Sequence, residues 1–187
     1  MLEIEKYIGR PNLASEGGEW QLNLAPSLQT NLNHICELVL LTLEPLYCRL
    51  ICHYQNINIL VAQSGVATAQ MLADTQSFRQ SLYYRDQLNA VDITDANWVC
   101  VGEGYHRVSV PITLYDVRDD KVLFGYLELY YSQKHDFLPK DISTLNVVVR
   151  DITSHLEQHR HIIESNQARE LDQLVSEYNK DWIYVKD

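Results

Sequence analysis

The sequence lacks the features that direct a chain to membranes or nucleic acids. Its longest near-apolar run, residues 38–46, is interrupted by Thr42, Glu44 and Pro45 and is too short to span a bilayer. The first ten residues have no basic leader before an apolar core, so we expect no signal peptide. There is no run of four basic residues, and the net charge is -10. An acidic surface repels phosphate backbones and anionic lipids, so we expect no nucleic-acid or membrane partner and predict a cytoplasmic location.

Cysteine is scarce, and phosphate-binding loops are missing. The four cysteines, Cys36, Cys48, Cys52 and Cys100, include no Cys-x-x-Cys pair. Three of them lie in apolar runs, which favours buried free thiols over a redox or metal role. No P-loop, Gly-x-Ser-x-Gly or complete Gly-x-Gly-x-x-Gly motif occurs, because Gly102-Glu-Gly104 has no third glycine. The sequence therefore carries no signature of the enzymes that use these motifs.

The patterns that are present predict one mixed α and β domain. The chain has 187 residues, of which 46% are hydrophobic and 21% charged, and this suits one domain with an appendage. We expect a helix that begins after an N-cap at Ser27 and ends before Pro45. The further expected segments of the first half are strands over 47–54 and 57–63, a polar helical stretch over 67–88, and a loop over 89–104 with an apolar patch at 98–101.

The clearest local pattern is a long antiparallel hairpin of residues 105–115 and 121–131. Alternate residues are aliphatic in both segments, and a polar, turn-rich link joins them. The simplest register pairs aliphatic residues across the two strands: Leu114 with Leu123, Val110 with Leu127, and Val108 with Leu129. The opposite face then carries polar and aromatic side chains: Arg107, Ser109, Thr113, Tyr126, Glu128 and Tyr130.

A long helix is predicted after the hairpin, opening at Lys140-Asp141. Its apolar residues recur at heptad-like spacing: Ile142, Leu145, Val149, Ile152, Leu156 and Ile163. Residues 164–170 have no apolar face, and the pattern resumes weakly, in a different phase, at Leu171 and Leu174. Either this helix has a break or its outer part is solvated.

Four segments carry a resemblance to a known family: Val108-Ser-Val-Pro-Ile112, Phe124-Gly-Tyr-Leu-Glu-Leu-Tyr-Tyr-Ser132, Phe137-Leu-Pro-Lys-Asp141, and the helix through Leu145 and Leu156. With them, residues 105–160 resemble the C-terminal half of a GAF domain, and the order of elements over 27–160 is similar to that of this sensory family. The resemblance implies an α+β fold, with an antiparallel five- to six-stranded sheet and helices on both faces. It also implies a ligand pocket on the face away from the first and last helices.

The mixed face of the predicted sheet is the candidate ligand site. Arg107 and Glu128 lie diagonally across the hairpin, and Arg49 of the earlier strand can join them. In a covered cavity each of these charges needs another charge or a polar ligand. A structural ion pair or a solvated sheet face is the alternative. The candidate ligand-binding residues are Arg49, Arg107, Ser109, Tyr126, Glu128 and Tyr130.

Other chemistries are less well supported. Some GAF domains attach a bilin through a loop cysteine, but here Val101 follows Cys100 where those families place a histidine. The glycine-rich cysteine loops of the branch that reduces methionine sulfoxide are not visible, and the cyclic-nucleotide signature cannot be placed. His155 and His159 share a helix face near His161, but two ligands do not complete a tetrahedral zinc site. We therefore expect no metal site and assign no cofactor.

These observations predict a non-catalytic regulatory domain. We divide the chain into an N-terminal extension (1–26), a GAF-like sensor domain (27–163) and a C-terminal helical tail (164–187). We expect the domain to bind a small molecule or a partner protein, to signal through its terminal helices, and to form a homodimer through residues 28–43 and 141–163. Alternatively, both helices only cover their own sheet. A ligand-free dimerisation or scaffolding domain and a cysteine-dependent redox enzyme remain alternative functions.

Overall fold

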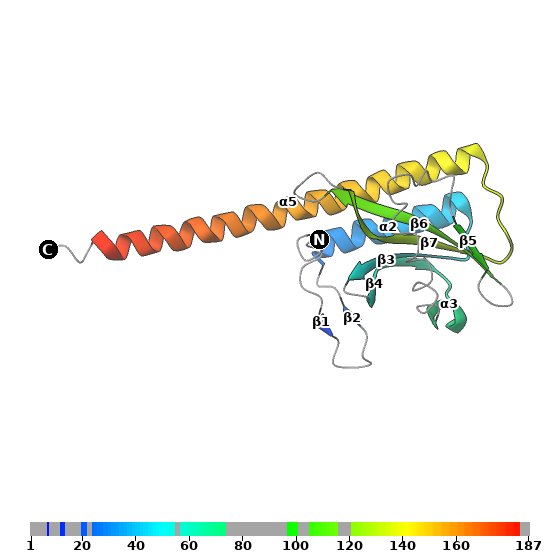
Figure 1. The fold of residues 1–187 in the computed structure, drawn as a ribbon, viewed down its shortest axis with the longest axis horizontal. Coiled ribbons are helices and arrows are strands. Elements are labelled where there is room, and N and C mark those ends of the chain that lie inside the picture. Colours follow the sequence, from blue (N-terminus) through cyan, green and yellow to red (C-terminus); the bar gives the residue numbers. More distant parts are fainter. Residues whose placement is uncertain are drawn as a thin grey trace.

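A computed structural model (Figure 1) describes residues 7, 12–13, 20–21, 24–54, 57–73, 97–100, 105–115 and 121–183. Its described elements are, in chain order, β1 (Asn12–Leu13), β2 (Trp20–Gln21), α2 (Pro26–Leu43), β3 (Tyr47–Tyr54), β4 (Ile57–Gly65), α3 (Ala69–Ala73), β5 (Asn97–Cys100), β6 (His106–Tyr115), β7 (Lys121–Tyr131) and α5 (Pro139–Ile183).

An antiparallel sheet forms the centre of the fold. Its strands follow the order β4-β3-β7-β6-β5, and every neighbouring pair is antiparallel. Because β3 pairs with β7, the first hairpin of the chain lies directly beside the second. The α+β class and the antiparallel sheet predicted from the sequence are confirmed. The apolar patch at 98–101 largely coincides with β5, which pairs with β6.

Helices α2 and α5 cover one face of this sheet, and they also contact each other (Figure 1). The aliphatic residues of β6 and β7, with Cys48, Leu50 and Cys52 of β3, form one buried core with the inner faces of these helices. The periodic apolar residues Leu32, Leu145 and Leu156 are all buried there. Both helical stripes therefore face the chain's own sheet.

The second face of the sheet meets the short helix α3. Met71 of α3 packs with Tyr47, Tyr105 and Tyr130 in a small cluster separate from the main core. The polar helical stretch expected over 67–88 is seen as helix over Ala69–Ala73, and residues 74–88 lie outside the described residues.

The register of the hairpin matches the prediction except near its turn. Val108 lies opposite Leu129 and Val110 opposite Leu127, as predicted. The predicted pairing of Leu114 with Leu123 is wrong, because the register shifts between Ile112 and Thr113 and places Leu114 opposite Val122. Such a bulge inserts one extra residue into β7 and reverses the alternation beyond it. As a result Phe124, which strict alternation assigns to the mixed face, is buried in the main core.

The ends of α2 differ slightly from the sequence prediction. Ala25, not Ser27, is the N-cap, and it makes no side-chain hydrogen bond. Pro26 takes a first-turn position, where its fixed φ suits a helix and its missing N–H costs nothing. At the other end Glu44 adopts a left-handed conformation with φ of 54°, and its N–H donates to the carbonyl of Leu40. The helix thus stops just before Pro45, as predicted.

Helix α5 is continuous and extends well beyond the sheet (Figure 1). Residues 165–177 are exposed, so the loss of the apolar pattern after residue 163 reflects solvation and not a break. At its start, the carboxylate of Asp141 accepts a hydrogen bond from the N–H of Leu138 at 2.9 Å. None of the helices in the described chain is both long and apolar enough to cross a membrane.

The N-terminal segment contacts the domain at the base of the projecting helix. Tyr7 is buried in the main core, and its hydroxyl donates to the carbonyl of Tyr115 at 2.8 Å. Arg160 of α5 donates to that same hydroxyl at 2.8 Å. Residues 12–13 and 20–21 form a two-stranded antiparallel ladder. Part of the predicted N-terminal extension (1–26) is therefore attached to α5 and to the end of β6.

Candidate functional site

Three neighbouring strands bring charged side chains together on the second face of the sheet. Arg49 of β3 lies opposite Glu128 of β7, and Ser109 of β6 lies opposite the same glutamate. Directly opposed residues share a face, so all three point away from α2 and α5. Arg107 of β6 lies opposite Tyr130 of β7, and each is two residues along its strand from the Ser109–Glu128 pair, so both lie on the same face. The sequence correctly predicts which residues of these two strands share this face.

The two arginines converge on one buried carboxylate. Nε of Arg49 donates to Oε2 of Glu128 at 2.7 Å, and Nη1 of Arg107 lies 3.3 Å from Oε1. The hydroxyl of Tyr130 donates to Oε2 at 3.0 Å. Arg49, Arg107 and Glu128 are 4%, 1% and 0% exposed. Charges removed from water to this extent require close partners, which excludes the alternative of a solvated sheet face.

Aromatic side chains surround this ionic cluster. The ring centroid of Tyr130 lies 5.6 Å from that of Tyr47 and 5.7 Å from that of Tyr105. The guanidinium carbon of Arg49 lies 5.2 Å from the same Tyr130 centroid. The hydroxyl of Tyr47 donates to Gln63 at 2.6 Å. The cluster thus combines charge with flat apolar surfaces, a combination common in small-molecule sites.

Helix α3 closes one side of the cluster through its backbone carbonyls. Nη1 of Arg49 donates to the carbonyl of Met71 at 3.1 Å, and the hydroxyl of Tyr105 donates to the carbonyl of Gln70 at 3.3 Å. Burial is the largest single influence on Arg49 and lowers its pKa, but the charge of Glu128, the hydrogen bond to it and the neighbouring Tyr130 and Tyr47 together outweigh burial, so the pKa is raised overall. Arg49 is therefore positively charged in the folded protein.

The structure joins four of the six candidate residues and leaves two at the margin. Arg49, Arg107, Glu128 and Tyr130 form the cluster, whereas Ser109 and Tyr126 lie half-buried on the same face. Burial, with a smaller contribution from the Glu128 charge, raises the pKa of Tyr126.

Three contributors were missed by the sequence reasoning. Tyr47 and Tyr105 each stand two residues before a candidate arginine, so strand alternation alone could have placed them on the same face. Met71 comes from a short helix, and no pattern in the sequence connects it to β3.

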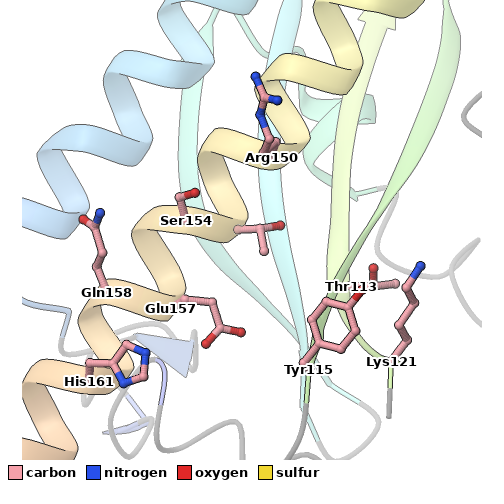
Figure 2. A pocket seen from close by; sticks show the side chains of 9 residues that line it. Thr113, Tyr115, Lys121, Arg150, Ser154, Glu157, Gln158 and His161 are labelled. Atoms are coloured by element: carbon pink, nitrogen blue, oxygen red, sulfur yellow. The ribbon is translucent and has the colours of Figure 1, made fainter. Parts of the chain in front are cut away.

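A separate cleft lies on the other side of the molecule, between α5 and the turn end of the β6–β7 hairpin (Figure 2). It has a volume of about 500 Å³, and most of its lining side chains are exposed. Glu157 in its wall is paired with Arg160 at 2.9 Å. The remaining cations, Lys121 and Arg150, are exposed, so water weakens their attraction for a ligand. The buried cluster is the stronger candidate site.

Among the side chains that the structure describes, the cysteines and histidines show no arrangement typical of catalysis. Cys36, Cys48 and Cys52 are buried free thiols. A hydrogen bond to Cys36, together with burial, raises the pKa of Cys48, and burial raises the pKa of Cys52, so neither forms a nucleophilic thiolate readily. The side chain of Cys100 lies outside the described residues.

The histidines of α5 make contacts with different neighbours. His155 lies 3.9 Å from Asp151, and His161 lies 3.8 Å from Glu164. Burial lowers the pKa of His159. Within the described ranges, no group of three or more histidine, cysteine, aspartate or glutamate side chains is placed to hold a metal ion.

Comparison with known proteins identifies the fold. No family model and no curated protein sequence matches the chain. Among solved structures, a domain assigned to a two-component sensor histidine kinase of Sinorhizobium meliloti 1021 matches with a TM-score of 0.53 and 14% identity, covering 76% of this chain and 99% of that one.

Two further matches are GAF domains by description. One, from a sensor histidine kinase assigned in Pseudomonas syringae pv. tomato, has a TM-score of 0.44, 17% identity, and coverage of 76% of this chain and 82% of that one. The other, the phycocyanobilin-bound GAF domain of a cyanobacterial phytochrome, has a TM-score of 0.46, 11% identity, and coverage of 71% and 85%. Several of the solved structures that match are thus GAF domains by description, in line with the resemblance seen in the sequence. The match with a TM-score of 0.53, to the sensor histidine kinase domain, is 14% identical and supports the fold alone, not a ligand.

Proposed function

We propose that this chain is a regulatory sensor module of the cytoplasm that binds a small molecule on the second face of its sheet and performs no catalysis. The buried convergence of Arg49 and Arg107 on Glu128 is the observation that carries the proposal. A purely structural sheet face rarely buries three charges, because apolar side chains of similar volume are as stable or more so. The proposed ligand-binding residues are Arg49, Arg107, Ser109, Tyr126, Glu128 and Tyr130.

Transmission of the signal is assigned to α5. This helix packs on β6 and α2 and then continues outward, and a change on one side of the sheet reaches it through the strands that carry the cluster. Glu128 and the core residues Leu127 and Leu129 are adjacent on β7, so a shift of the strand moves both faces. This makes β7 the element that connects the proposed site with the helix.

The homodimer through residues 28–43 and 141–163 remains part of the proposal. The buried stripes of these helices face the sheet, so a dimer contact has to use their outward residues. Leu41 and Val147 supply apolar surface there, since they are 72% and 55% exposed. The C-terminal tail would then leave the dimer as the output segment.

A ligand-free scaffolding domain is the second candidate, and one observation favours it. Tyr47, Tyr105, Tyr130 and Met71 already pack together beside the ionic cluster. If these side chains fill the space on this face, no room for a ligand remains and the fold serves only to hold the helices. The two functions therefore differ in whether this face accepts a molecule.

Retention of a small molecule tests the proposal. The full chain is incubated with a cell metabolite extract, desalted, and weighed by native mass spectrometry. We expect a bound molecule on the wild type and on Ser132→Leu, a loop substitution. It should be lost from Ser109→Leu, which adds bulk beside Glu128. If no molecule is retained, or if Ser109→Leu retains it equally well, the scaffolding function is favoured and the sensor site is rejected.

A further inference from the structure

We infer that the ligand presents a singly charged carboxylate, whose oxygens accept hydrogen bonds from Nη2 of Arg49. This inference rests on the proposed function, since it names the ligand class for the same site. It depends on the hydrogen-bond donors of one buried guanidinium and on the charge beside them.

The donors of Arg49 are only partly used within the protein. Its Nε donates to Glu128 and its Nη1 to the carbonyl of Met71. Nη2 is buried and has no hydrogen-bond partner in the described part of the chain. A guanidinium has five N–H groups, two of them on Nη2, and burying them unpaired is unfavourable. An acceptor therefore belongs at this position.

The charge of the guanidinium selects the kind of acceptor. Arg49 is 4% exposed and remains cationic, so an anionic oxygen gains more than a neutral carbonyl. A planar carboxylate matches the planar fork of N–H groups. A cationic ligand is disfavoured, because it would be placed against this charge.

Glu128 limits the charge that the ligand can carry. Its Oε2 lies 2.7 Å from Nε of the same guanidinium, so a second anion at Nη2 sits close to an existing one. The two arginines and Glu128 together carry a net charge of +1, so a monoanion neutralises the buried cluster, whereas a dianion leaves an uncompensated buried negative charge, which is costly. A carboxylate is therefore favoured over a phosphate. The ring of Tyr130, over which Arg49 lies, offers a flat surface to the body of the ligand.

Titration with minimal probes tests the inference without knowing the whole ligand. In full-length protein labelled with ¹⁵N-arginine, the side-chain signals of Arg49 are followed by NMR on addition of acetate, acetamide or inorganic phosphate. We expect a saturable shift with acetate and about tenfold or weaker binding of acetamide and phosphate. Arg169, an exposed arginine on the projecting part of α5, serves as the internal control and should show only a weak, non-saturating change.

Two variants complete the test. Arg49→Lys keeps a positive charge but removes Nη2, and acetate should bind to it about tenfold more weakly, whereas Arg169→Lys should bind acetate like the wild type. If Arg49→Lys does not fold, the titration of the wild-type protein with the three probes still decides the question. No saturable acetate shift, or equal binding of acetamide, overturns the inference. The sensor proposal survives that result if the metabolite experiment still yields a bound molecule, and both fail if it does not.

Discussion

At the scale of single residues, the cluster concentrates a large desolvation cost in three side chains. Glu128 is the anion on which both arginines converge, and Tyr130 adds a hydrogen bond to the same carboxylate. In such an arrangement the pair interactions offset the loss of hydration only when every partner is present. The cluster is therefore sensitive to loss of one charge.

Glu128→Gln should be strongly destabilising for this reason. The substitution keeps the shape of the side chain but leaves buried guanidinium groups beside a neutral amide, and we expect a loss of about 3 kcal/mol in the free energy of unfolding. Urea unfolding monitored by circular dichroism measures it. Glu170→Gln, at an exposed position of α5, is the matched control and should change stability by less than about 0.5 kcal/mol. Equal losses of stability in the two variants would show that the charge of Glu128 does not stabilise the fold more than an exposed charge does.

Alkaline pH should destabilise the protein through Tyr47. Burial raises the pKa of Tyr47 to about 12 from its ordinary value of 10.0. The folded state keeps this proton longer than the unfolded state, so the stabilising contribution is full below pH 10 and is lost as the pH rises through about 12. The loss is at most about 3 kcal/mol for a shift of this size.

Urea unfolding at about pH 9 and about pH 11.5 tests this dependence. The wild type should lose more stability between the two conditions than Tyr47→Phe does. Tyr115→Phe, which changes an exposed tyrosine, should behave like the wild type. An identical pH dependence in all three proteins would contradict the assignment to Tyr47.

Sequence reasoning placed the charged residues correctly because strand alternation is a strict rule. Alternation alone places Arg107 and Glu128 on one face of the hairpin, whereas the position of Arg49 beside Glu128 also depends on the pairing of β3 with β7, which the sequence does not reveal. Whether a cavity covers them is a different matter. Met71 arrives from a helix whose position depends on tertiary packing, so its contact with Arg49 could not be predicted from local patterns.

At the scale of elements, the β6–β7 hairpin shows where alternation stops being sufficient. The sequence predicts both strands and their polarity, but not the bulge that pairs Ile112 with Gly125 and Thr113 with Leu123. A bulge changes the register by a single residue, and no composition signal marks it here beyond the glycine itself. Phe124 consequently joins the main core instead of the mixed face.

Gly125 should be intolerant of any side chain. On the β3 side it lies opposite Cys52, and a Cβ added to it would overlap the carbonyl oxygen of Ile51. Since that atom belongs to the backbone of the paired strand, Gly125→Ala must separate β7 from β3. We expect a loss of about 1–3 kcal/mol or more in the free energy of unfolding.

Thermal and urea unfolding of Gly125→Ala measure this cost. Leu60→Ala, a truncation at an exposed position of β4, provides a comparison within the same sheet and should cost much less. Wild-type stability in Gly125→Ala would mean that the two strands are not held as closely as described.

At the scale of the whole molecule, the sheet separates two regions with different roles. One face is an aliphatic core against α2 and α5, and the other carries the buried charges and the tyrosines. The sequence predicts this division, because periodicity in strands and helices reports which side is buried. It does not predict what meets the outward side of α2 and α5, since exposed leucines look alike whether they face water or a second subunit.

Exposed apolar residues on α2 and α5 should hold two copies of the chain together. Leu41 and Val147 are 72% and 55% exposed on the two helices that cover the sheet. A dimer would remove these apolar side chains from water, and this burial stabilises the association. A carboxylate buried at the same positions is strongly unfavourable. We therefore expect the double variant Leu41→Glu/Val147→Glu to be a folded monomer and the wild type to be a dimer.

Sedimentation velocity gives the mass in each case, and circular dichroism confirms that the double variant remains folded, since neither residue belongs to the buried core. Val66→Glu, at an exposed apolar position after β4, should remain dimeric and controls for added charge. A monomeric wild type would reject the homodimer altogether. A double variant that stays dimeric would instead place the contact elsewhere, and the exposed Leu171 and Leu174 on the projecting part of α5 would be the next surface to test.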